Sequence, residues 1–187
     1  MTLDELIIET ANNVGEEISK TEGVYAGDSL IIVNKIITGL NDAKNRMAER
    51  IGYYETETVT LVSAEFDKAD LTNTIKNIVT IESDDYPVIY VENGDGTVKI
   101  MGGDDEDVDV TYSYLLPDMV IGTLTGVCPV DNALDLTYYA AYKYFLQDGG
   151  ESATRKAANW LALWKESLNK IRKSAAQPQQ IVDVYGW

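Results

Sequence analysis

Apolar residues near both ends of the chain recur at steps of three and four, which is the period of one helix face. This pattern predicts four helices, over residues 2–19, 28–51, 130–148 and 152–175. The second has a long stripe, made of Leu30, Val33, Ile37, Leu40, Met47 and Ile51. Gly39 lies inside that helix, where glycine marks either a weak point or a place of close packing.

The two C-terminal helices are rich in aromatic residues. On the third helix we expect Tyr138 and Tyr142 to face the core, with Tyr139 and Tyr144 pointing elsewhere. The fourth helix places Trp160 and Trp164 on its apolar stripe, so an aromatic cluster between the two helices is predicted.

The middle of the chain changes to a period of two, which is typical of half-buried strands. Residues 75–81 alternate, with Ile75, Asn77, Val79 and Ile81 on one face, and residues 108–116 do the same. Asn93-Gly94-Asp95-Gly96 joins two β-rich runs, and these residue types tolerate positive φ, so a hairpin is predicted there. Residues 55–117 are therefore expected to form an antiparallel β unit.

The predicted fold class is α+β, mainly α. We expect an antiparallel bundle of four helices, an inserted small antiparallel β unit and an extended C-terminal arm. The corresponding domains are residues 1–54 with 118–178 for the bundle, 55–117 for the β unit, and 179–187 for the arm.

Residue types that carry most catalytic chemistry are missing. The chain has no histidine and a single cysteine, Cys128, which excludes Ser-His and Cys-His catalysis and a zinc site built from Cys and His. Four successive carboxylates, Asp104 to Asp107, lack the alternate spacing of an EF-hand and are read as a polar turn. Gly94-Asp95-Gly96 lacks the context of a nucleotide loop. We therefore expect no catalytic residue, metal or cofactor, and a carboxylate-based enzyme is the least favoured reading.

The net charge is −16, and it is unevenly spread. An acidic chain is repelled by phosphate, so sequence-specific binding of DNA or RNA is not expected. Residues 151–176 are the exception, with six basic residues against two acidic ones. This basic stretch is either a solvated helix face or an inter-subunit face that meets acidic surface, carried by Arg155, Lys156, Lys165, Arg172 and Lys173.

The C-terminal tail is apolar although it follows Pro178, which ends helical structure. Two readings stay open: a strand that folds back on its own domain, or an arm that docks on another protein. The docking reading rests on Ile181, Val182, Val184, Tyr185 and Trp187. No apolar run approaches the roughly 18 residues of a membrane span, and the acidic N-terminus is unlike a secretory signal, so we expect a soluble, cytoplasmic product without a membrane partner.

Three segments, in this order, resemble the head–tail connector (adaptor) proteins of tailed bacteriophages. Residues 110–118 resemble the family's strand ending in Tyr-x-Tyr-x-x-Pro, and residues 133–145 resemble its Tyr-Ala-Ala-Tyr helix. Gly149-Gly150-Glu151, with residues 157–160 and 164–168, resembles its closing helix. The resemblance covers nearly the whole chain.

The resemblance implies a structural, non-enzymatic virion protein at the head–tail interface, made in the host cytoplasm. Such subunits form a ring, commonly a dodecamer, beneath the portal protein. The ring extends the DNA channel, and DNA passes through its lumen without sequence-specific binding. It offers a platform to the next tail-connector or tail-completion protein, and its C-terminal arm reaches the portal. The alternative is another phage assembly protein, such as a tail-completion or minor capsid protein.

Overall fold

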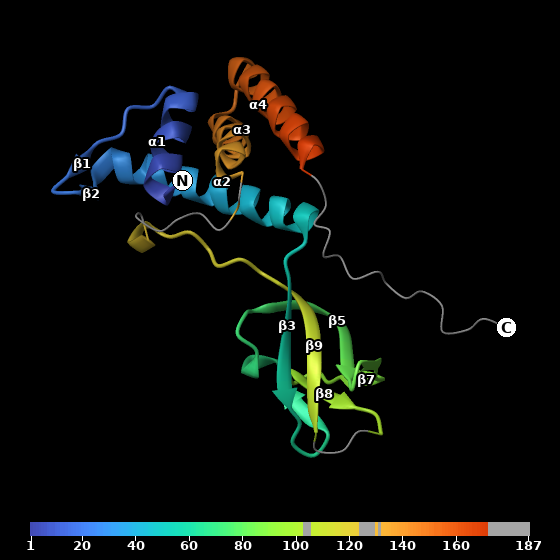
Figure 1. Cartoon of the computed structure of the whole chain (residues 1–187). Helices are drawn as coiled ribbons and strands as arrows, with labels where there is room; N and C mark the ends of the chain where they lie inside the picture. The colour runs from blue at the N-terminus through green and yellow to red at the C-terminus, as the bar shows by residue number, and fades with distance from the viewer. Residues whose placement is uncertain (103–105, 124–129, 131, 172–187) are drawn as a thin grey trace. The chain divides into compact units, whose positions relative to one another are not determined.

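The chain divides into two compact units, each described by itself below. The computed structural model describes residues 1–102, 106–123, 130 and 132–171 (Figure 1). The helical unit comprises Met1–Ile51 and Leu116–Arg172, and the β unit comprises Gly52–Leu115.

The helical unit begins with a well-capped helix. The side chain of Thr2 accepts a hydrogen bond from the Glu5 N–H, and the Glu5 carboxylate accepts one from the Thr2 N–H, so the two residues form a capping box. The helix ends when Gly15 adopts a left-handed conformation with φ 81°, which glycine adopts without strain. The α-helices in the described part of this unit are α1 (Leu3–Val14), α2 (Gly27–Ile51), α3 (Leu136–Asp148) and α4 (Glu151–Lys170).

A small hairpin connects α1 and α2. Its strands, β1 (Lys20–Thr21) and β2 (Val24–Tyr25), pair antiparallel around Glu22 and Gly23, which both have positive φ. Asp4 of α1 anchors the hairpin, because it accepts hydrogen bonds from the Lys20 ammonium at 2.6 Å and the Tyr25 hydroxyl at 2.7 Å.

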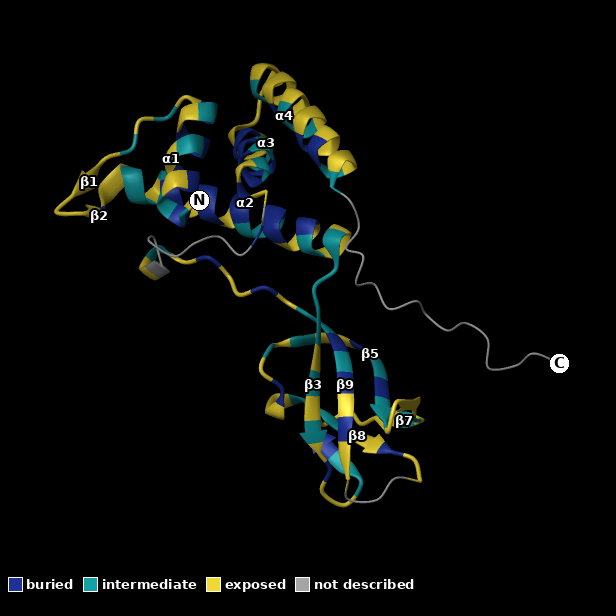
Figure 2. Cartoon of the chain, in the orientation of Figure 1, coloured by how far each residue is buried: buried dark blue, intermediate teal, exposed yellow. Residues whose placement is uncertain are grey.

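Helix α3 is the centre of the helical unit. It packs against α1, α2 and α4, whereas α4 packs mainly on α3 and leaves its other side exposed (Figure 2). Ala140 of α3 is fully buried, and a Cβ at Gly39 of α2 would lie only 2.9 Å from its Cα. Gly39 therefore marks close helix packing rather than a weak point.

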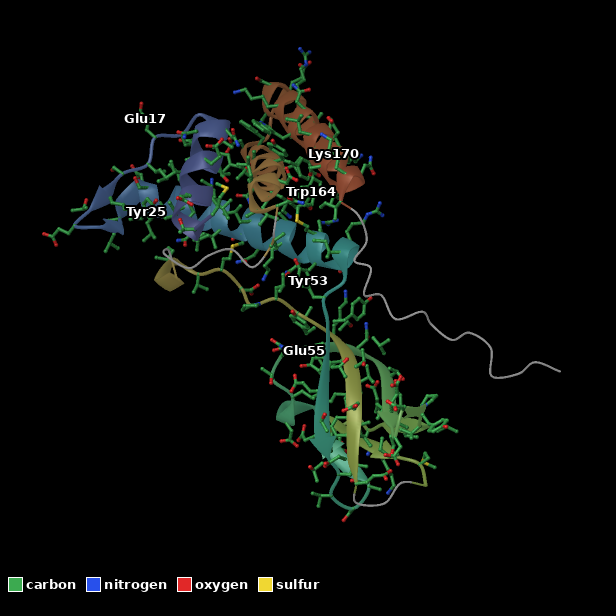
Figure 3. The ribbon with its side chains drawn as sticks, viewed as in Figure 1. Glu17, Tyr25, Tyr53, Glu55, Trp164 and Lys170 are labelled. Atoms are coloured by element: carbon green, nitrogen blue, oxygen red, sulfur yellow. The ribbon has the colours of Figure 1, made fainter. Side chains whose placement is uncertain are left out.

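The aromatic cluster between α3 and α4 is present, but the predicted tyrosine orientation is wrong. Tyr139 and Tyr144 are buried, whereas Tyr138 and Tyr142 are half-buried. Trp164 of α4 is labelled in Figure 3. Tyr139 packs on it with ring centroids 5.3 Å apart, and Tyr138 stacks on Trp160 at 5.9 Å. The prediction failed because α3 is covered by three helices, so its buried surface is broader than one stripe.

Among its described residues, the β unit contains two sheets built from seven strands. One sheet has the order β3 (Tyr54–Thr60), β9 (Asp107–Tyr114), β5 (Ile75–Ser83) and β6 (Tyr86–Pro87). The other has the order β4 (Glu65–Asp67), β8 (Thr97–Ile100) and β7 (Tyr90–Glu92). All pairings are antiparallel.

Both sheets contribute to one hydrophobic core. Its buried residues come from the strands and from the loops that follow β3 and β4: Leu61, Phe66, Leu71, Ile78, Ile81, Val98, Ile100, Val108, Val110 and Tyr112. The hairpin predicted at residues 93–96 is confirmed, since β7 pairs with β8 and the Asn93 N–H donates to the Thr97 carbonyl oxygen at 2.9 Å.

The predicted fold class is wrong. Among the described residues there are four helices and three sheets with nine strands, and strand residues make up 26%, which is more than a small β insertion in a four-helix bundle. The bundle itself is replaced by three helices around α3. The β1–β2 hairpin was not predicted, because a strand of two residues is too short to show an alternating pattern.

Several element boundaries also differ from the prediction. The first helix ends at Val14, because Gly15 caps it, and α4 ends at Lys170. Alternation across residues 75–81 is interrupted by two register shifts in the pairing of β5 with β9. Ile78 therefore faces the core with Ile81, and the predicted face shared by Asn77, Val79 and Ile81 is wrong. The predicted arm, 179–187, lies outside the described residues.

Trp164 provides the test of the helical core. Its side chain is 2% exposed, so Trp164→Ala is expected to destabilise the fold by about 3–5 kcal/mol. Leu163→Ala, at a neighbouring position that is 43% exposed, is the matched control. Thermal melts followed by circular dichroism measure both. Equal melting temperatures for the two variants would contradict the assigned helix face.

Candidate functional site

Acidic charge is concentrated in the β unit. Residues 52–115 contain fifteen Asp and Glu against three Lys, a net charge of −12. Residues 1–51 and 116–172 contain fifteen acidic and eleven basic residues, a net of −4. The β unit therefore accounts for most of the net negative charge of the chain. Its surface is the first candidate for a site that attracts or repels charged partners.

The outer face of the β3–β9–β5 sheet is polar and acidic. Residues paired across strands point to the same side, so the rows Thr60–Asp107, Thr58–Asp109–Glu82 and Thr56–Thr111–Thr80 share this face. The threonine hydroxyls donate to Asp109 and Asp107, both at 2.6 Å. These rows contain no basic residue, so their carboxylates give the face a negative potential.

At the edge of the same sheet, Glu57 ties a loop to the strands. Its carboxylate accepts hydrogen bonds from the Thr72 N–H and hydroxyl, at 3.1 and 3.0 Å, and from the Tyr112 hydroxyl. Burial opposes ionisation of Glu57, but the hydrogen bonds from Tyr112 and Thr72 together outweigh it and lower the pKa of this carboxyl. For Tyr112, burial and then the hydrogen bond to Glu57 raise the pKa to about 12. The role of Glu57 and Tyr112 is structural, because neither group exchanges a proton readily near neutral pH.

In the helical unit, a buried lysine holds the segment that follows the β unit. Lys44 of α2 is 0% exposed, and its ammonium donates to the carbonyl oxygens of Leu116 at 2.9 Å and Pro117 at 2.7 Å. Its third partner is the Asp118 carboxylate, at 2.9 Å. Three donors thus meet three acceptors, which is the condition for burying an ammonium group.

Asn41, one turn earlier on α2, extends this contact. Its side-chain amide donates to the Met119 carbonyl oxygen and its oxygen accepts from the Met119 N–H, both at 2.9 Å. Lys44 and Asn41 were not singled out from the sequence. The available signal was position: Lys44 falls between Leu40 and Met47 on the apolar stripe, where a solvated lysine does not belong.

The basic residues predicted to form an inter-subunit face are exposed where the structure describes them. Arg155, Lys156 and Lys165 all lie on the surface of α4, and Arg172 and Lys173 lie outside the described residues. Arg155 pairs with Glu151 at 2.5 Å, whereas the Lys156 ammonium lies 5.1 Å from the centre of the Phe145 ring. Lys156 and Lys165 are nine residues apart, which places them on opposite sides of α4, so they do not form one basic face. An inter-subunit role for these residues stays a prediction.

The predicted docking residues Ile181, Val182, Val184, Tyr185 and Trp187 lie outside the described residues, as do Asp104 and Asp105 of the carboxylate run 104–107. In the described ranges no group of three or more potential metal ligands gathers. None of the helices described there is long and apolar enough to cross a membrane. The structural features that remain are surfaces and packing contacts.

The sequence was compared with family models and with curated proteins. The model of the family described as SU10 adaptor protein matches residues 1–183, nearly the whole chain. No curated protein matches the sequence.

Lys44 is the first test of the site. Lys44→Met removes the donor for two carbonyl oxygens, each costing about 1–3 kcal/mol when left unpaired, so we expect a loss of about 2 kcal/mol or more. For a chain of this size that corresponds to a fall in melting temperature of roughly 4–8 °C. Arg50→Met, at an exposed position on the same helix, is the control. If Lys44→Met and wild type melt at the same temperature, the hydrogen bonds of Lys44 to residues 116–118 contribute nothing to stability.

Glu57 gives the β unit a predicted acid sensitivity. Because the folded-state pKa of Glu57 lies below its ordinary value of 4.5, its stabilisation is complete above that value and is lost as pH falls through the lower folded pKa. Wild type should therefore lose more stability between about pH 5 and about pH 3 than Glu57→Gln does. Urea unfolding at each pH measures this difference. Glu106→Gln, which changes an exposed glutamate of the same unit, is the control and should keep the wild-type pH dependence of stability. A wild-type pH dependence in Glu57→Gln would refute the role assigned to Glu57.

Proposed function

Because the chain belongs to the SU10 adaptor protein family, we propose that it is the subunit of a head–tail adaptor ring beneath the portal, which extends the DNA channel and carries the next tail component. Membership in this family makes the chain a bacteriophage adaptor, a structural component of the virion, and it confirms the family resemblance seen in the sequence. The match over residues 1–183 is the observation that carries the proposal.

The charge distribution supports a role around DNA without binding it. A channel wall must let a polyanion slide, and a negative surface repels phosphate. The outer face of the β3–β9–β5 sheet has this character, with Asp107, Asp109 and Glu82 and no basic residue in its paired rows. We assign this face to the lumen of the proposed ring.

The helical unit supports a role as a rigid scaffold. Its contacts are close packing, such as Gly39 against Ala140, and buried polar clamps, such as Lys44 and Asn41 on residues 116–119. Such contacts fix the positions of the surfaces that a ring must present to its neighbours. The partners we propose are further copies of the chain, the portal protein and a tail-connector or tail-completion protein, with assembly at the head–tail interface.

The proposal is tested by mixing purified portal with this protein and examining the mixture by electron microscopy. We expect an added ring of density on one end of the portal, at the axial channel. Binding of the protein to tail components but never to portal would overturn the proposal in favour of a tail-completion role.

The C-terminal segment provides a sharper version of this test. Truncation after Gln177 should leave the circular-dichroism spectrum and the melting temperature nearly unchanged while abolishing assembly on portal, because residues 179–187 are proposed to dock there. Nine ordered residues gain little net free energy in one subunit, but the many arms of a ring engage together. Unfolding of the truncated protein would mean that the segment belongs to the core, and wild-type assembly would place the docking site elsewhere.

A further inference from the structure

The β4–β8–β7 sheet exposes apolar side chains on its outer face. The Met101 N–H donates to the Ile89 carbonyl oxygen at 2.8 Å, and the next pairs toward the hairpin are Tyr90 with Ile100 and Val91 with Lys99. Side chains two residues apart share a face, so Ile89, Met101 and Val91 lie together on the side away from the core. They are 76%, 54% and 48% exposed. We call these three residues the β patch.

Carboxylates lie beside the β patch on the same face. Val91 pairs with Lys99, which pairs with Glu65, and Asp67 follows Glu65 by two residues, so both carboxylates lie on the β4 side of this face. Lys99 is already paired with Glu65 at 3.0 Å. A partner for this face must therefore offer an apolar anchor together with positive charge.

Helix α4 offers that combination. Leu163 is 43% exposed, and Lys156 and Lys170 stand seven residues before and after it, almost in line along the helix. Seven residues of helix span about 10.5 Å, and two strand spacings, from β7 to β4, span about 9.6 Å. With Leu163 on the β patch, a lysine reaches the position of Glu65 and Asp67. We call Lys156, Leu163 and Lys170 the α4 row; Lys170 lies at the C-terminal end of α4 (Figure 3).

The existing contacts of the two lysines leave them available. Lys170 pairs with Glu166 at 2.8 Å, with both side chains well exposed, and exposed pairs of this kind contribute little. Lys156 lies over the Phe145 ring. The apolar surface and the opposite charges thus match in kind and in spacing.

We propose that the α4 row of one copy of the chain docks on the β patch of the next copy. The contact joins two different surfaces, so it is heterologous and generates a closed ring when the rotation between copies closes. The inference rests on the proposed function, in which copies of the chain form a ring. It adds the residues that join neighbouring copies.

Photo-cross-linking in the assembled ring tests the contact directly. A benzophenone amino acid replaces Leu163, isotopically heavy and light chains are mixed, and the cross-linked peptides are identified by mass spectrometry. We expect cross-links between heavy and light chains that map to residues 88–101. The same probe at Leu146, which is 50% exposed on α3, should not give them. Cross-links only within one chain, only to other segments, or none at all would overturn the proposal.

A pair of charge variants tests whether the contact joins two different surfaces, the α4 row and the β patch. Leu163→Glu places a carboxylate against an acidic face, and Ile89→Lys places an ammonium against the α4 row, so each variant alone should assemble at least about tenfold more weakly than wild type. Mixed together, the variants retain one intact contact, between the α4 row of Ile89→Lys and the β patch of Leu163→Glu. The reverse contact sets the new carboxylate of Leu163→Glu against the new ammonium of Ile89→Lys, so in sedimentation the mixture should assemble more strongly than either variant alone.

Leu146→Glu and Val62→Lys, which change exposed apolar residues elsewhere in each unit, are the controls and should assemble as wild type does. Melting temperatures confirm that all four variants fold. Wild-type assembly by either test variant would overturn the proposed contact. Ring formation on portal with cross-links elsewhere would refute this contact while leaving the proposed function standing, whereas failure of the wild type to bind portal would refute the proposed function.

Discussion

The buried ammonium of Lys44 fixes the place where the chain re-enters the helical unit. An ammonium group without water is stable only when each of its donors finds an acceptor. Lys44 meets this condition with the carbonyl oxygens of Leu116 and Pro117 and the carboxylate of Asp118. A shift of this segment by one residue would move the Asp118 carboxylate away from the ammonium, so the ion pair favours the observed position of the segment. Asn41 adds a second constraint through Met119. Helix α2 thus both leads into the β unit and holds the segment that follows it.

Close packing around α3 explains a sequence pattern that has no chemistry of its own. Within Tyr139-Ala140-Ala141-Tyr142, the alanines are fully buried and Ala140 meets Gly39, so small side chains let α2 and α3 approach. Tyr139 packs on Trp164 and on Tyr142, which joins α4 to the same core. A resemblance carried by this segment is therefore a resemblance in scaffold. What distinguishes members with such a scaffold has to lie in their surfaces.

Charge is distributed between the two units in a way that suits an assembly protein. The β unit carries a net of −12 and the helical unit a net of −4, with four basic residues on α4 within the described part of the chain. A subunit that presents unlike surfaces can attract its own copies head to tail and still repel DNA elsewhere. Both properties come from composition that is segregated along the chain, not from a localised reactive centre.

The sequence by itself determined most of the local elements, the absence of histidine chemistry, the uneven charge and the family. These follow from periodicity, residue type and order, which are local or additive properties, as the Thr2–Glu5 cap and the hairpin at residues 93–96 show. The tertiary structure decided which side of each element is buried. Three helices cover α3, so Tyr139 and Tyr144 are buried, and two register shifts in β5 turn Ile78 inward. Lys44 shows the limit most clearly: its place on the apolar stripe of α2 was visible, but its three acceptors lie more than seventy positions away in the sequence, and only folding brings them together.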